Sequence, residues 1–102
     1  SDLSAPAFAG TAVGVDIAPM MHVRDTAYSL IRLQVEAGSF MDGRSINALQ
    51  DENDMDIVMH ERSETVEVHP DGDLVVRPGD TLVIFARHTH IMQIVARNRR
   101  NS

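Results

Sequence analysis

Five histidines and fifteen carboxylates are the side chains of this 102-residue chain that could bind a metal ion. Two of the histidines, His88 and His90, form an H-x-H pair directly after an apolar segment. On a β-strand both imidazoles would point to one face, which is the arrangement used by metal-binding barrels. Here the pair falls where a strand is expected to pass into a helix, so a polar helix start is the simpler interpretation.

The densest acidic segment is residues 51–56. A calcium loop of the EF-hand type needs glycine at its sixth position and glutamate at its twelfth. Counted from Asp51, those positions hold Asp56 and Arg62, so the segment is not an EF-hand. A looser divalent-cation site remains open, with Asp54 and Asp56 as its candidate ligands. The alternative is a solvated loop between a helix and a strand.

No motif in the chain indicates catalysis. It contains no G-x-G-x-x-G fingerprint, no P-loop and no G-x-S-x-G elbow. None of its many carboxylates stands out as a general acid or base. We therefore expect a protein that is not an enzyme. The chain also has no cysteine, which excludes disulfides and thiolate metal sites.

The charge of the chain bears on its partners. The net charge of -6 and the pI of about 5.1 argue against nucleic acid or anionic lipid as the main partner. No apolar run approaches the roughly 20 residues that span a bilayer. The chain opens with Ser1 rather than methionine, so we expect a piece of a longer polypeptide. Three basic residues are expected to complement the end of a last helix: Arg97, Arg99 and Arg100.

The length predicts one folded domain, which we place at residues 25–102. Residues 1–24 are interpreted as a lead-in from a preceding domain followed by a weak first strand. Between residues 4 and 14 the apolar residues recur at helical spacing, although proline and glycine weaken the helix. Residues 17–23 are the weak strand candidate, interrupted at Pro19, and a turn is expected at residues 24–26.

Alternating apolar and polar residues predict a strong strand from Tyr28 to Glu36. Its inward side chains are expected to be Ile31, Leu33 and Val35. Ser45 suits the N-cap of a short helix, Ile46 to Glu52. The next strand is predicted at residues 55–61. Two of its side chains, Ile57 and Met59, are expected on the same side of the strand.

The last third of the chain predicts turns, strands and a closing helix. Residues 65–68 form a short strand or an extended loop, residues 69–73 a tight turn and residues 74–76 a short strand. Pro78 and Gly79 suit the central positions of a type II turn. Residues 81–86 are nearly all apolar, which predicts a central strand buried on both faces. A helix follows from Thr89, and its apolar seam is Ile91, Met92, Ile94 and Val95.

These elements predict an α+β fold, with a mainly antiparallel sheet and about two helices packed on one face of it. Read from end to end, the chain resembles the C-terminal regulatory domain of the Trk-A and potassium-conductance-regulator family. The resemblance covers nearly the whole chain and lies in the order and spacing of several short motifs. They are residues 7–14, Val35-Glu36-Ala37-Gly38-Ser39, Gly43-Arg44-Ser45-Ile46 with Leu49, Ile57-Val58-Met59 with Arg62, His69-Pro70 with Asp73-Leu74, and residues 78–84.

The resemblance implies a regulatory domain on the cytoplasmic face of the cell membrane. Its upstream partners in the parent protein would be a nucleotide-binding Rossmann-like domain and a membrane pore. It implies pairing with a second copy, a ring in the parent, and ligand binding that gates a potassium channel or transporter. No cofactor is expected within the fragment itself. In some members a small ligand or cation lies between two such domains, and Arg62, His69 and Pro70 correspond to the segment that lines that region.

The segment from Glu64 to Val68 departs from the commoner family pattern. It resembles a long loop and carries two glutamates, which disfavours an anionic ligand and favours a cation or no ligand. Two alternatives remain open. The domain could only assemble subunits, or it could be a metal-dependent barrel of the cupin type, suggested by residues 78–80 and 88–90. The predicted closing helix and the small number of strands argue against the barrel.

Overall fold

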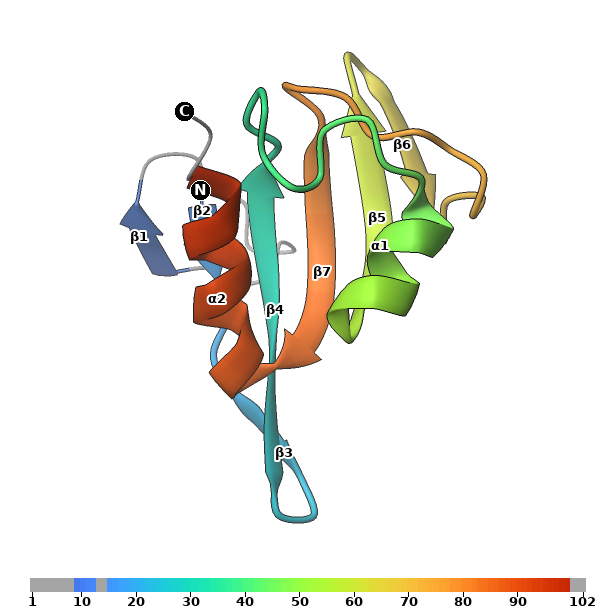
Figure 1. The fold of residues 1–102 in the computed structure, drawn as a ribbon. Coiled ribbons are helices and arrows are strands. Elements are labelled where there is room, and N and C mark those ends of the chain that lie inside the picture. Colours follow the sequence, from blue (N-terminus) through green and yellow to red (C-terminus); the bar gives the residue numbers. More distant parts are fainter. Residues whose placement is uncertain (1–8, 13–14, 100–102) are drawn as a thin grey trace.

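The computed structural model describes residues 9–12, by their backbone, and residues 15–99. One antiparallel sheet of seven strands carries both helices on the same face, as Figure 1 shows. The α+β architecture expected from the sequence is therefore confirmed. The strands are β1 (Ala9–Ala12), β2 (Val15–Ile17), β3 (Met21–Val23), β4 (Thr26–Gln34), β5 (Met55–Arg62), β6 (Thr65–Val68) and β7 (Thr81–Arg87). The helices are α1 (Ile46–Asn53) and α2 (His88–Arg99).

The spatial order of the sheet is β1-β2-β4-β7-β5-β6, and β3 pairs with β4 beyond the end of β2. The last strand in the sequence, β7, thus lies at the centre, between β4 and β5. Its apolar composition suits that place, because a central strand buries more side-chain surface than an edge strand. Figure 1 shows α2 lying across the β4 side of the sheet and α1 beside β5.

The core lies between the sheet and the two helices. Ile31 of β4, Ile84 of β7 and Ile57 of β5 stand side by side across three strands, and all three are buried. The predicted inward residues Ile31 and Leu33 of β4 are confirmed, and Val35, also buried as predicted, directly follows the strand. Helix residues close the core from the other side: Ile46, Leu49, Ile91, Ile94 and Val95. Met92 does not belong to this seam, because its side chain is 57% exposed, and Asn98 is buried near the end of α2.

Strand β5 contains a β-bulge that changes which residues face the core. Ile57 pairs with Ile84 and Met59 pairs with Val83, so Val58 is an extra residue without a partner on β7. Because side chains alternate along a strand, one extra residue exchanges the two faces beyond it. The expectation that Met59 lies on the same side as Ile57 is therefore wrong, and His60 is buried on that side instead. The side chain of Gln50 accepts a 2.9 Å hydrogen bond from the Ile57 amide beside the bulge.

Strand β7 is buried on one face only, which corrects a second expectation. Leu82, Ile84 and Ala86 face the helices and are buried, whereas Val83 and Phe85 on the opposite face are half-buried. No helix of the described residues covers that opposite face. The apolar composition of β7 predicts burial on both sides, but the helices cover only one of them.

The expected elements in the irregular segments are partly confirmed. Ser45 caps α1 by accepting a hydrogen bond from the Ala48 amide, and Gly79 has the positive φ of 90° that its turn requires. Residues 74–76 form only an isolated bridge, at Val75 with Ser45, instead of a strand. Residues 9–12 form β1 and not the end of a helix. The other residues of that helical lead-in, 4–8 and 13–14, lie outside the described residues.

Residues 15–23 add two short strands to the same sheet, β2 and β3, on either side of Pro19. Residues 64–68 are also more regular than expected. They complete a tight β5–β6 hairpin whose turn is at Ser63 and Glu64, so the segment is not a long loop.

Candidate functional site

The only carboxylate that is buried among the described residues belongs to Asp80, which is 2% exposed and directly precedes β7. Arg62, the last residue of β5, donates to both of its oxygens, from Nε at 2.9 Å and from a terminal nitrogen at 2.8 Å. His60 donates from Nε2 at 2.8 Å, and the backbone amide of Arg77 donates at 2.9 Å. Four hydrogen bonds from three residues thus hold one buried carboxylate.

The turn and the bulge together position this group. The type II turn at Pro78 and Gly79 brings the Arg77 amide within reach of the Asp80 side chain, three residues further on. The bulge at Val58 directs His60, and with it Arg62 two residues later, to the side on which Asp80 lies. The backbone of Asp80 is held as well, because its carbonyl accepts a 2.8 Å bond from the Val35 amide.

The electrostatics of Asp80 follow from these contacts. Burial alone raises the pKa of its carboxyl group, because the charged form loses hydration. The hydrogen bonds from Arg62, the Arg77 amide and His60, with the charge of Arg62, outweigh burial and bring the pKa to about 2. The hydrogen bond to Asp80 is likewise the main cause that raises the pKa of Arg62. The pair is therefore charged at neutral pH.

A hollow of about 330 Å³ lies beside this group. It is lined by His60 and Arg62, by Thr65 and Glu67 of β6, and by Ser63 and Leu74. Glu67 stands directly across from His60, and Thr65 across from Arg62, on neighbouring strands. The hollow therefore offers a guanidinium already bound by Asp80 and one exposed carboxylate.

His69 and Pro70 lie at the other end of the β5–β6 hairpin. The His69 amide bonds to the Val58 carbonyl, four residues before Arg62, which corresponds to about 13 Å along the strand. His69 is exposed and has a positive φ of 58°, and Pro70 is half-buried. Of the three residues suggested by the resemblance, only Arg62 lines the hollow beside Asp80. Within one copy the structure does not bring the three together.

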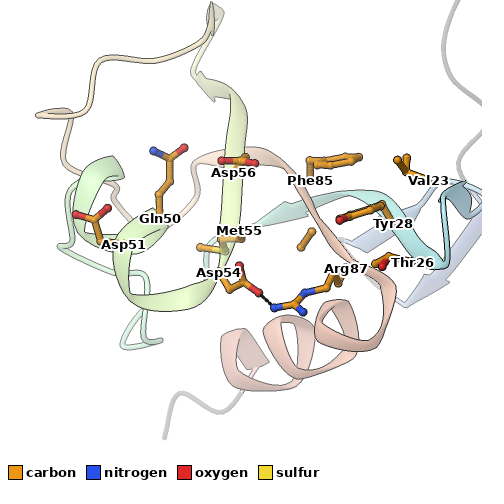
Figure 2. A pocket seen from close by; sticks show the side chains of 11 residues that line it. Val23, Thr26, Tyr28, Gln50, Asp51, Asp54, Met55, Asp56, Phe85 and Arg87 are labelled. Carbon is orange, nitrogen blue, oxygen red and sulfur yellow. Dashed lines mark hydrogen bonds and ion pairs between the residues drawn. The ribbon is translucent and has the colours of Figure 1, made fainter.

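Asp54 and Asp56 line a second and larger hollow, of about 760 Å³, shown in Figure 2. Tyr28 and Phe85 stack in its wall, with ring centroids 5.1 Å apart. Asp54 is paired with Arg87, drawn as the dashed line in Figure 2, and this hydrogen bond is the main cause that lowers the pKa of Asp54. Asp56 stands apart from that pair. Among residues 15–99, no three histidine or acidic side chains come together as metal ligands would.

His88 and His90 both lie in the first turn of α2 and have separate partners. His88 Nδ1 is 2.9 Å from the Ser29 hydroxyl, and His90 is hydrogen bonded to the Asn53 carbonyl. The described sheet is open, with β1 and β6 at its two edges. A cupin-type barrel would be closed, so the fold does not match that alternative.

The sequence interpretation missed Asp80 and His60 as members of the site. In the sequence Asp80 stands out only as a member of the motif at residues 78–84, although an aspartate directly before an apolar strand can pair with a nearby arginine. His60 and Arg62 are two residues apart, the spacing that puts both on one face of a strand. That spacing was the available signal. The bulge at Val58 cannot be recognised from the spacing, so the sequence did not indicate that His60 and Arg62 lie on the same side as the core.

A family model described as the TrkA-C domain matches residues 30–98, about two thirds of the chain. The fold and this match define a regulatory domain, since TrkA-C is a regulatory and not a catalytic domain family. The chain belongs to the TrkA-C domain family, whose members are regulatory domains of potassium-transport proteins. The comparison with curated proteins gave no match. Neither helix of the described part of the chain is long and apolar enough to cross a membrane.

Proposed function

We propose that this chain is a ligand-responsive regulatory domain of a potassium channel or transporter, on the cytoplasmic side of the membrane. In this proposal it works as a pair of copies and passes a binding signal to pore and nucleotide-binding domains elsewhere in the parent protein. The observation that carries the proposal is the TrkA-C match over residues 30–98, together with an open α+β fold that matches the resemblance. A regulatory domain of this kind has no reaction to catalyse.

The arrangement around Asp80 offers a route for the signal. Arg62 lines the hollow beside β6 and also donates to Asp80 and to the Val75 carbonyl. Asp80 in turn leads directly into β7, the central strand. A ligand that moved the Arg62 guanidinium would therefore act on the start of that strand. A ligand shifts such an equilibrium only by its difference in affinity for the two states.

The charges of the hollow bear on the class of ligand. Both acidic oxygens of Asp80 already accept from Arg62, so the guanidinium is not a free anion receptor. Glu67 adds an exposed carboxylate, and the chain as a whole carries a net charge of -6. A cation is the favoured ligand on these grounds, with the other hollow, at Asp54 and Asp56, as the competing location.

The test is a thermal-shift titration of the purified chain after chelation, against calcium, magnesium, adenine nucleotides and cyclic dinucleotides. A ligand that binds only the folded state increases the free energy of unfolding, by about 2.7 kcal/mol at a hundredfold excess over Kd, and therefore raises the melting temperature. We expect one cation to give a saturable rise. Glu67→Gln should weaken the response, and the matched control Asp56→Asn should leave it unchanged.

The opposite pattern would move the binding to the hollow of Figure 2. A response to a nucleotide in place of a cation would contradict the ligand class. No response to any compound would contradict ligand sensing and favour a second candidate, a domain that only assembles subunits. The apolar face of the sheet opposite the helices is the observation that favours this second candidate.

A further inference from the structure

The face of the sheet opposite the helices carries a continuous band of apolar side chains. Directly paired residues point to the same face, so the register identifies the members of the band. Met21 pairs with Tyr28, Leu30 with Phe85, and Met59 with both Val83 and Val68. Five strands contribute to it. We refer to this surface as the helix-free face, and its apolar residues are Met21, Val23, Tyr28, Leu30, Met59, Val66, Val68, Val83 and Phe85.

The exposure of these side chains is unusual for a surface. Large hydrophobic side chains exposed among residues 15–99 number seven, and four of them belong to this face: Met21, Val23, Val66 and Val68. Val68 is 63% exposed. Single apolar residues on a surface need no explanation, but a contiguous patch marks an interaction site. The patch explains why β7 is apolar on both sides although the helices cover only one.

The helix-free face contains hollows that could receive side chains from another protein surface. A hollow of about 300 Å³ is lined by Leu30, Val58, Met59 and Val83, with Arg32 and Glu61 at its margin. The stacked rings of Tyr28 and Phe85 border the larger hollow of Figure 2 next to it. Hollows lined by aliphatic and aromatic groups accept apolar side chains from a partner, and such anchors supply most of the energy of an interface.

The size of the face is adequate for a dimer. Five strand positions at about 4.8 Å spacing and a seven-residue central strand give roughly 24 Å by 23 Å. This projected area, on the order of 550 Å², is comparable with the area of about 800 Å² that each partner buries in a standard interface. Because side chains protrude from the sheet, the accessible surface area of the face is larger than this projected area.

The charges around the face point to a second copy as the partner. Arg32 and Arg87 border it together with Asp16, Asp56 and Glu61, so both signs are present. Away from its axis, a two-fold operation places each residue of a patch opposite a different residue, so a patch of mixed sign can complement itself. An anionic membrane would require cations alone, which a chain of net charge -6 does not offer.

We propose that two copies of this chain pack sheet against sheet through the helix-free face, in a two-fold dimer whose core is formed by Leu30, Met59, Val83 and Phe85. This inference rests on the pairing of copies proposed above and names the surface that performs it. The helices of both copies then lie on the outside of the assembly.

The first test is sedimentation velocity of the chain across a range of concentrations. We expect the unmodified chain to form dimers. Val83→Arg places a charge at the centre of the face and should raise the dimer dissociation constant about thirtyfold or more. Met92→Arg is the control, because Met92 is also apolar but is 57% exposed on α2, which lies on the opposite side of the sheet. Circular dichroism shows whether each variant is folded.

A second measurement does not depend on a disruptive variant. The chain has no cysteine, so one introduced thiol reports alone. The alkylation rate of Met59→Cys should fall as the protein concentration rises, whereas the rate of Met92→Cys should stay constant. A chain that remains monomeric would overturn the proposal, and so would a dimer in which the Met59→Cys thiol keeps its full reactivity.

These outcomes are separable from those of the ligand titration. A dimer through this face with no thermal response to any ligand supports the interface and contradicts sensing. A saturable response in a chain that stays monomeric does the reverse.

Discussion

Two aspartate–arginine pairs in this domain have the same chemistry and different surroundings. Asp80 and Arg62 meet beside the central strand, and the side chain of Asp80 is 2% exposed. Asp54 and Arg87 meet at the rim of the large hollow, with side chains 62% and 56% exposed. The first carboxylate has three further features: burial, a second side-chain donor in His60, and a backbone donor in Arg77.

The comparison indicates that an ion pair contributes to stability according to how well protein hydrogen-bond donors replace the hydration that the charged groups lose on folding. An exposed pair exchanges solvation for a screened contact and gains little. A buried carboxylate cannot return to water while the protein is folded, so removing its charge or its donors leaves polar groups unpaired. The lowering of the pKa to about 2 despite burial shows that the donors around Asp80 more than replace its hydration.

The largest expected effect is that of Asp80→Asn. The substitution removes the charge that Arg62 and His60 face, and we expect a loss of about 3 kcal/mol in the free energy of unfolding. Urea unfolding followed by circular dichroism measures it, with a linear extrapolation to zero denaturant. A loss similar to that of an ordinary surface substitution would contradict the comparison between the two pairs.

The pH dependence of stability isolates the charge of Asp80. The pKa of Asp80 is about 2 in the folded state and 3.8 in the unfolded state. Between these two pH values the folded state therefore binds fewer protons than the unfolded state. The stabilisation is therefore complete above the unfolded value and is lost as the pH falls toward the folded one. Between about pH 5 and about pH 2 the stability difference between the unmodified chain and Asp80→Asn should shrink by about 2 kcal/mol. A constant difference would show that the charge is not the stabilising feature.

The smallest expected effect belongs to Asp54→Asn. Both partners of that pair are mostly in water, and salt screens their attraction. We expect the urea midpoint to stay within the error of the measurement at physiological ionic strength. A destabilisation as large as that of Asp80→Asn would remove the contrast between the pairs, and a small one that disappears in high salt would sharpen it.

The alternation of apolar residues was enough to predict the main elements of the fold. Ile31, Leu33 and Val35 repeat with a period of two, and the buried residues of α2 repeat with a helical period, so both patterns indicate which side faces the core. The predictions that failed, at β1 and Met92, concern residues whose structure depends on contacts with other elements of the fold. The strand β1 is supported by pairing with β2 and not by its own composition. Met92 lies one residue after Ile91, at the margin of the buried helical stripe, and its side chain is 57% exposed.

The site was harder to predict than the fold. Arg62 was identified through the resemblance, but its partner Asp80 is 18 residues further along the chain and meets it only because β5 and β7 are neighbours. Periodicity describes one element at a time and cannot report such a contact. The helix-free face was also present in the sequence as the second apolar side of residues 81–86, and it was interpreted as burial inside the same chain.

The bulge at Val58 has a consequence for how this domain can vary over evolution. The bulge shifts the alternation of inward and outward side chains by one residue. The inward positions are Met55 and Ile57 before it, and His60 and Arg62 after it. Mutational tolerance along β5 should therefore not follow a simple period: the sensitive positions are separated by two, three and two residues. Loss of the extra residue would keep all four inward and merely straighten the strand. A lineage could thus delete Val58, but a deletion immediately before or after Arg62 would have no such spare residue to absorb it.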